Sequence, residues 1–147
     1  MKNTIRLMTA LSLCVIFLLG CRKDPNTPIY LTDPPKGGYL GEYDIKDYED
    51  KIEQCPSDKN VGPIVDADDA IEKGVSVLID MYGEEIINDE EPFKTYYDPN
   101  SDTWLIQGSM DPMVEYPDGR IIIPHGGVGE VIINASDGDV IAAWHGQ

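Results

Sequence analysis

Basic residues are scarce in this chain: of its 147 residues, 11 are Lys or Arg and 27 are Asp or Glu, so the formal net charge is −16. A phosphate backbone needs a basic face, and this balance argues against a nucleic-acid partner. The chain has three cysteines, too few for the disulfide framework of a small secreted domain. Its length suits one compact domain and not two ordinary ones.

Long apolar runs are also missing. The longest apolar stretch, Leu7 to Leu19, has 13 residues, whereas a membrane-spanning helix needs roughly 20. Lys2 and Arg6 precede it, and a cationic start before a short apolar run is typical of a secretory signal. The first 20 residues are therefore set apart from the fold, which leaves 127 residues (147 − 20) for the mature chain.

The apolar stretch ends in Leu18-Leu19-Gly20-Cys21, which resembles the bacterial lipobox. In that motif a peptidase cuts before a cysteine whose sulfur has been lipidated, and Gly20 is small enough for the position before the cut. We predict a lipoprotein signal peptide over 1–20 and lipid attachment at Cys21; the alternative is a plain secretory signal. Two or three acyl chains anchor a protein firmly, which predicts a location in the bacterial cell envelope, at its periplasmic face or on the cell surface.

Residues 22–62 differ in composition from the rest of the mature chain. They hold nine Pro or Gly, and their apolar side chains are few and scattered. Such a segment buries too little surface to offset its chain entropy, so residues 21–62 are predicted to be a lipidated flexible tether that packs only in part on the domain. Within it, residues 44–54 suit a short polar helix that ends before Pro56, and the lone Cys55 is interpreted as structural.

Helical periodicity begins near residue 66. Ile71, Val75 and Leu78 recur at helical spacing, and Gly83 supplies a C-terminal stop. The first turn is acidic, which the helix dipole favours, and it offers three candidates for the N-cap: Asp66, Asp68 and Asp69. We predict one amphipathic helix over about 67–82.

The remaining sequence has the pattern of strands separated by turns. Strand patterns cover 93–97, 103–108, 127–135 and 140–144, with a further short one at 120–123. They predict an α+β domain over 63–147, in which the main N-terminal helix packs on a curved antiparallel sheet of about four strands. One helix covers one face, so we expect the other sheet face to meet solvent or a partner.

Three patterns bear on chemistry, and each has a structural alternative. The first is a candidate zinc set whose spacing fits no ligand signature: His125, Glu130 and His145. The second matches the start of a calcium loop, although a hairpin turn needs the same residue types: Asp98, Asn100 and Asp102. The third, Gly126 to Gly129, opens a strand rather than a helix, so it indicates a bulge or a close backbone approach and not a phosphate loop. We predict no catalytic residue, no metal and no cofactor.

The order of motifs from residue 66 on resembles a known family. It runs through Asp68-Asp69-Ala70-Ile71, Tyr82-Gly83-Glu84-Glu85, Pro92-Phe93-Lys94, the Trp strand Thr103 to Gly108, the Gly-Gly strand Gly126 to Ile133, the hairpin Asp137 to Val140 and terminal His145-Gly146. This order is similar to that of bacterial immunity proteins with a nuclear transport factor 2 fold, from polymorphic toxin systems. The resemblance covers about 66–147. It implies a cone-like fold of the cystatin or nuclear-transport-factor kind, and a non-catalytic protein that binds a cognate toxin and blocks it.

One segment departs from the family pattern. Members usually pass quickly from the Trp strand to the Gly-Gly strand, whereas residues 109–125 are inserted here. The insertion is either an added partner loop or a solvated hairpin extension. Together with the acidic run at 89–91 it supplies the candidate partner-binding residues: Asp89, Glu90, Glu91, Asp111, Met113, Glu115, Tyr116 and Asp118.

Charge adds a partner class to the resemblance. From residue 63 on, 18 acids stand against three cations, and a field of one sign suits a partner of the opposite charge. Together they predict an envelope-anchored immunity protein that neutralises a basic protein toxin. The alternative is a lipoprotein module that binds or assembles envelope components and has no toxin partner. An enzyme is a third hypothesis, for which the sequence offers no site chemistry.

Overall fold

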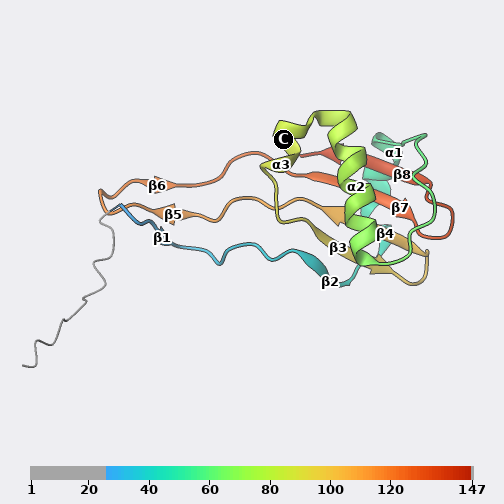
Figure 1. The fold of residues 1–147 in the computed structure, drawn as a ribbon, viewed down its shortest axis with the longest axis horizontal. Helices are drawn as coiled ribbons and strands as arrows, with labels where there is room; N and C mark the ends of the chain where they lie inside the picture. Colours follow the sequence, from blue (N-terminus) through green and yellow to red (C-terminus); the bar gives the residue numbers. More distant parts are fainter. Residues whose placement is uncertain (1–25, 147) are drawn as a thin grey trace, which may run out of the picture.

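The computed structural model describes residues 26–146, so the predicted signal peptide and Cys21 lie outside the described residues. The body is a five-stranded sheet in the order β2-β3-β4-β7-β8 (Figure 1). Its strands are β2 (Gly38–Glu42), β3 (Lys94–Asp98), β4 (Thr103–Gln107), β7 (Gly129–Asn134) and β8 (Val140–His145). The last four pair as antiparallel neighbours, and their bounds lie within two residues of the predicted ones.

Helix α2 (Ala67–Tyr82) has the predicted bounds. The Asp66 carboxylate accepts a hydrogen bond from the Asp69 backbone N–H at 2.9 Å, and the Asp69 carboxylate accepts one from the Val65 N–H at 2.9 Å. These reciprocal bonds fasten the start of the helix in the manner of a capping box. Gly83 ends it with a φ of 95°, a left-handed conformation that glycine adopts without steric cost. A short helix, α3 (Glu84–Asn88), follows.

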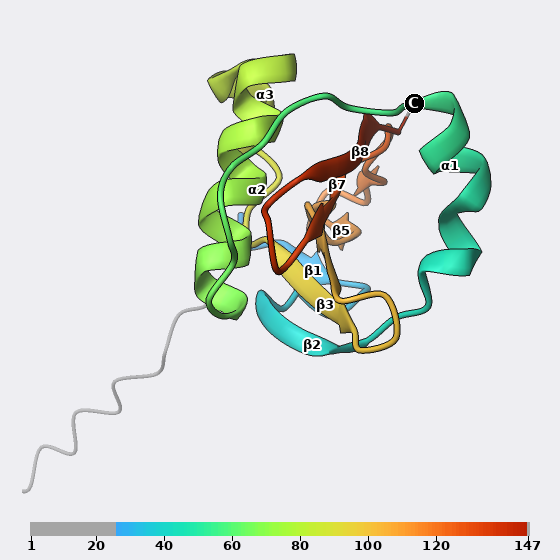
Figure 2. The same ribbon diagram turned by 90° about the vertical axis from the view of Figure 1, so that its right-hand side faces the viewer.

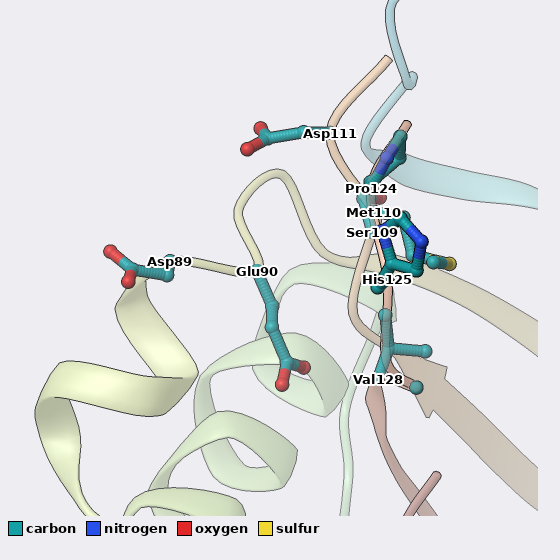
Figure 3. Close-up of a pocket in the computed structure, with 9 residues that line it drawn as sticks. Asp89, Glu90, Ser109, Met110, Asp111, Pro124, His125 and Val128 are labelled. Carbon is teal, nitrogen blue, oxygen red and sulfur yellow. The ribbon is translucent and has the colours of Figure 1, made fainter. Parts of the chain in front are cut away.

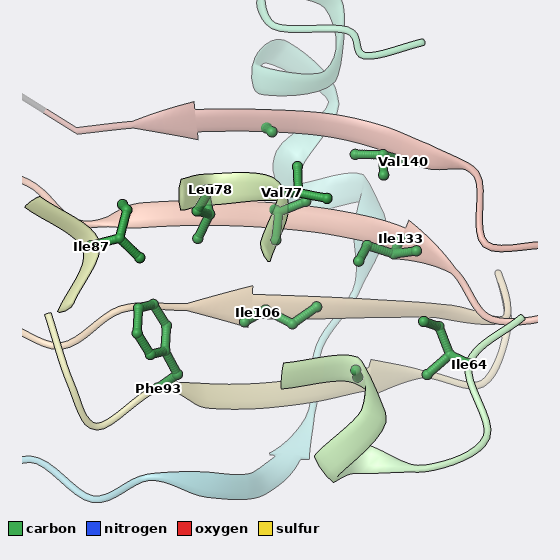
Figure 4. Close-up of a cluster of buried hydrophobic side chains, with 11 residues drawn as sticks. Ile64, Val77, Leu78, Ile87, Phe93, Ile106, Ile133 and Val140 are labelled. Carbon is green, nitrogen blue, oxygen red and sulfur yellow. The ribbon is translucent and has the colours of Figure 1, made fainter. Parts of the chain in front are cut away.

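The apolar stripe of α2 packs on one face of the sheet (Figure 4). Gly74 of α2 lies where a Cβ atom would crowd the Ile106 side chain of β4, so this glycine lets the helix approach the sheet closely. The buried members of this first cluster are Ile64, Ala70, Val77, Leu78, Ile87, Phe93, Ile106, Val131, Ile133, Val140 and Ala143.

The opposite face is also covered, which corrects the prediction of a face open to solvent or a partner. A 3₁₀ turn, η1 (Ile45–Tyr48), and helix α1 (Glu49–Gln54) lie on the side of the sheet away from α2 (Figure 2). The second cluster joins four buried sheet residues, Leu105, Ile132, Ala142 and Trp144, to Tyr43, Ile45, Tyr48, Ile52, Cys55, Tyr96 and Ile141. Neighbours along one strand therefore face two different cores. The continuous apolar run Val131 to Ile133 indicates this two-sided burial in the sequence, because apolar and polar residues need not alternate along a strand that is buried on both faces.

The segment predicted as a flexible tether is structured in its described part, and from Gly38 on it packs on the body. Strand β2 pairs in parallel with β3 at the sheet edge, so the sheet has five strands and is not wholly antiparallel. The helix predicted at 44–54 is present as η1 and α1. Residues 56–60 then run beside the last hairpin, through bridges from Pro56 to Ala142 and from Asn60 to Asp139. The glycine-containing β2 has no strand periodicity of its own, and its pairing with β3 defines it.

Residues 26–37 and 109–127 leave the body together as a long projection, here named the arm (Figure 1). Its three strands are β1 (Ile29–Tyr30), β5 (Val114–Glu115) and β6 (Ile121–Ile122), all antiparallel in the order β1-β5-β6. At the tip, the Gly119 N–H donates to the Tyr116 carbonyl at 2.9 Å and closes the turn between β5 and β6. The inserted segment is thus a hairpin, and the predicted strand at 120–123 is β6.

Asp98, at the end of β3, fastens to the sheet the segment from Tyr43 to Cys55 that covers its second face, here named the covering segment. Its carboxylate accepts hydrogen bonds from the Ile45 N–H at 3.1 Å, the Asn100 N–H at 2.8 Å and the Ser101 hydroxyl at 2.7 Å. Burial by itself raises the pKa of a carboxyl group, but here the hydrogen bonds outweigh it and lower the pKa of Asp98 to about 2. The stretch considered as a calcium loop is therefore a hydrogen-bonded hairpin turn between β3 and β4.

We expect Asp98→Asn to lower the free energy of unfolding at neutral pH by about 2 kcal/mol, because a charged acceptor of three hydrogen bonds becomes neutral. The folded pKa lies below the unfolded value of about 3.9, so this stability is present above about pH 4 and is lost as the pH falls toward 2. Urea unfolding over a pH series measures it, with Asp50→Asn on the exposed surface of α1 as the control. A stability difference that does not shrink in acid contradicts the assignment.

Candidate functional site

A pocket of about 230 Å³ lies at the root of the arm, where the chain leaves β4 and later returns to β7 (Figure 3). The loop after α3 forms a third side. The nine lining residues of this arm-root pocket are Asp89, Glu90, Ser109, Met110, Asp111, Pro124, His125, Gly127 and Val128. In Figure 3 the Asp89 and Asp111 side chains extend outward, whereas Glu90 turns away from them into the body. The structure thus brings the two predicted acidic segments together at one place.

Glu90, predicted as a partner residue, faces inward and is 7% exposed. Its Oε2 accepts the Gly129 N–H at 2.6 Å, and its Oε1 lies 2.6 Å from Nε2 of His145. Gly108 leaves room for this carboxylate, since a Cβ at that position would overlap it. Glu90 therefore joins the α3–β3 connection to the start of β7 and the end of β8. Its role in the structure is that of an internal clasp, and its carboxylate bonds inward to the sheet.

His145 links Glu90 to Gly146, the last described residue. Its Nδ1 lies 2.7 Å from the Gly146 carbonyl oxygen, which only accepts, so Nδ1 donates. Its Nε2 lies 2.6 Å from the Glu90 carboxylate. The Tyr82 ring of α2 packs on the imidazole with ring centroids 5.5 Å apart. The Glu90 carboxylate and the His145 imidazole at the arm root thus bind each other.

The predicted residues of the insertion separate into a root and a tip. Asp111 is exposed at the root and lines the arm-root pocket with the exposed Asp89, while Glu91, also exposed, directly follows Glu90 of the same pocket. Met113 lies along the arm, half-buried, and its N–H donates to the Thr32 hydroxyl oxygen at 2.9 Å. The remaining three lie at the tip: Glu115, Tyr116 and Asp118.

The tip carboxylate of Asp118 is paired, unlike those at the root. At the tip, Arg120 donates its Nε–H to Asp118 at 2.6 Å, and its guanidinium carbon lies 5.1 Å from the Tyr116 ring centroid. The backbone N–H of Arg120, followed by its guanidinium, lowers the pKa of Asp118. Within residues 26–146, Asp89, Glu91 and Asp111 have no ion-pair partner.

The residues weighed as a zinc set do not meet. Glu130 and His145 come from neighbouring strands but face opposite sides of the sheet. Glu130 accepts Nε1–H of Trp144 at 2.6 Å on the side of the second cluster, and His145 lies on the α2 side. His125 is exposed at the arm root. No group of three metal-binding side chains comes together in the part of the chain that the structure describes.

Sequence reasoning missed the contact between Glu90 and His145. The two residues are 55 positions apart, and Glu90 was grouped with its exposed neighbours in an acidic run. A signal was present in the terminal His-Gly, which the resemblance singled out without giving it a structural role. The close approach expected at Gly126 and Gly127 is present at Gly127, where a Cβ would meet the Gly146 backbone, and not at Gly126, where a Cβ would meet nothing within 4 Å.

A family model described as NTF2 fold immunity protein matches residues 70–147, more than half of the chain. The chain belongs to the NTF2 fold immunity protein family. No curated protein and no solved structure matches it. The match begins inside α2, so β2 and the covering segment lie outside it.

Membrane contact by a spanning helix has no support between residues 26 and 146. None of the helices there is long and apolar enough to cross a bilayer.

We expect Glu90→Ala to lower the free energy of unfolding by about 3 kcal/mol, because the buried Gly129 N–H and the His145 imidazole both lose their partner. Urea unfolding of the variant measures this. The exposed neighbour provides the matched control, and Glu91→Ala should change stability by less than about 0.5 kcal/mol. Equal effects of the two substitutions contradict the internal role of Glu90.

Proposed function

We propose that this chain is an envelope-anchored lipoprotein that binds a cognate protein toxin and neutralises it without catalysis. Family membership over residues 70–147 is the observation that carries the proposal, since an immunity protein protects by engaging its toxin. The pairing of Glu90 with His145 supports binding rather than turnover. The two groups best suited to acid–base chemistry at the arm root already hold the fold together.

The toxin contact is proposed at the arm-root surface, defined by Asp89, Glu91 and Asp111 beside the arm-root pocket. These carboxylates are exposed and have no internal ion pair within the described chain. From residue 63 on, the 18 acids against three cations attract a basic partner over a longer range. The pocket offers a concavity for one of the partner's side chains, while the Glu90 clasp keeps the surface rigid from beneath.

The anchor is proposed at Cys21, from the lipobox-like Leu18-Leu19-Gly20-Cys21. Lipid on this residue holds the domain at the envelope, outside the cytoplasm. Such a position suits protection against a toxin that acts on the envelope or crosses it. Arg22 and Lys23 follow the anchor directly and bring positive charge close to the lipid surface.

Co-expression with a toxin gene adjacent to the gene for this chain tests neutralisation and contact site together. We expect the wild-type chain to restore growth. In the variant Asp89→Asn, Glu91→Gln, Asp111→Asn we expect the association rate with purified toxin to fall about tenfold at low salt and to depend less on salt, because steering charges are removed. A kinetic titration at two ionic strengths measures both.

The matched control removes the same charge elsewhere. Glu49→Gln, Asp50→Asn and Glu53→Gln lie on the exposed side of α1, far from the arm root (Figure 1), and should leave association nearly unchanged. If both triple variants slow association equally, the contact is not at the root. A gene neighbourhood without a toxin, together with no protection, replaces this proposal with the envelope-assembly module.

The anchor has its own test. We expect Cys21→Ser to abolish membrane association, because no other part of the mature sequence carries acyl chains. Detergent phase partitioning of the mature protein measures this, with Cys55→Ser as the control that keeps the anchor. Entry of the Cys21→Ser chain into the detergent phase after signal cleavage would show that the chain is not held by lipid on Cys21.

A further inference from the structure

The arm exposes large apolar side chains along both of its outer strands. Beside β1, Ile29, Tyr30 and Leu31 are 62%, 59% and 44% exposed. Beside β6, Ile121, Ile122 and Ile123 are 54%, 48% and 51% exposed. Single exposed apolar residues are ordinary on a protein surface, but a contiguous group on one thin ribbon marks an interaction site.

Strand register gathers part of this apolar surface, Tyr30 and Ile122, into one row with Val114 between them. Tyr30 pairs with Val114, and Val114 pairs with Ile122, so the three lie side by side on one face of the ribbon. With Pro28, Pro112 and Tyr116 they line a shallow groove of about 310 Å³, which also touches Asp111 at its root end. These six residues, Pro28, Tyr30, Pro112, Val114, Tyr116 and Ile122, are here named the apolar arm face.

We propose that the apolar arm face rests in the lipid interface of the membrane that holds the anchor, so this inference rests on the proposed lipidation. The register of Ile29 with Glu115 places the first described residue, Asn26, level with the β5–β6 turn at the arm tip. Cys21 precedes Asn26 by five residues, which span at most about 17 Å. Lipid on Cys21 therefore keeps the tip within reach of the bilayer surface.

The side chains at the tip suit the boundary between lipid headgroups and acyl chains. Tyr116 and the Arg120 guanidinium stack at the turn, and both residue types combine an apolar body with a polar end. Asp118 is paired with Arg120. Glu115 belongs to the row of Ile29 and Ile121, which faces away from the apolar arm face. The tip end of the apolar arm face thus enters lipid without burying an unpaired charge, since the unpaired Asp111 lies at the root end of the groove.

The rest of the molecule opposes lying flat on a membrane. Anionic headgroups repel the acidic body, with its 18 acids and three cations from residue 63 on. The arm therefore acts as a stand-off that docks at its tip and holds the body away from the bilayer. In this arrangement the arm-root surface stays open to a partner.

The test uses the lipidated full chain in vesicles of phosphatidylethanolamine and phosphatidylcholine. An environment-sensitive fluorophore is attached to Ile122→Cys and, in a second preparation, to Ser76→Cys on the exposed side of α2, both in a Cys55→Ser background. We expect the emission of the arm probe to shift to the blue in vesicles relative to the unlipidated chain in buffer, and that of the body probe to stay constant. Tyr30→Ser, Val114→Ser and Tyr116→Ser, which all lie on the apolar arm face, should together abolish the shift. They lower the docking equilibrium about a hundredfold, since each partly exposed apolar side chain contributes roughly fivefold.

The matched control removes three exposed apolar side chains from the body, Val65→Ser, Met81→Ser and Ile86→Ser, and should keep the shift. An arm probe that emits as in water in vesicles, or a body probe that shifts equally, overturns the proposal. So does self-association of the unlipidated chain that the three arm serines abolish, because a second copy then covers the face. If the chain carries no lipid, the anchor fails separately, and the same probe on chain added to vesicles from solution decides for the arm alone.

Discussion

Burial of one sheet on both faces is the constraint on which the rest of this structure depends. Along β4, Leu105 points to one core and Ile106 to the other, and the same division runs through β7 and β8. Each face then needs a cover, which α2 supplies on one side and the segment from Tyr43 to Cys55 supplies on the other. Because β2 and α1 lie outside the family match, the N-terminal part of this chain closes a surface that the matched region by itself leaves open.

The Glu90 clasp extends this constraint to the edge of the body. A buried carboxylate needs partners, and Glu90 finds them at the start of β7 and the end of β8. The root of the arm is where these same segments meet. The acidic arm-root surface therefore lies on a part of the body that these hydrogen bonds hold in place. Less conformational entropy is then lost when a partner binds there.

Charge and apolar surface are separated along the molecule. Open carboxylates gather at the arm root, whereas exposed isoleucines and tyrosine lie along the arm toward the tip. In the proposed arrangement the tip meets lipid and the root meets the toxin, so two different partners bind without competing. The arm length between them then sets the distance of the binding surface from the membrane.

Local signals in the sequence determined α2 and the four antiparallel strands. The Asp66 cap, the stop at Gly83 and the alternation around Trp104 each act within a few residues, so their outcome does not depend on distant parts of the chain. The family and its α+β class follow from the order of these elements. Even the two-sided burial had a signal in the run Val131 to Ile133, which a single-helix interpretation left unused.

Only the tertiary structure determined the features that depend on contacts between residues far apart in the chain. Strand β2 exists because β3 pairs with it in parallel, and the short helix α1 is held by a sheet face rather than by its own propensity. Glu90 turns inward while Asp89 and Glu91 stay exposed, because only Glu90 reaches His145. These contacts join residues far apart in the chain, and their free energy comes from burial and hydrogen bonding that no local pattern contains.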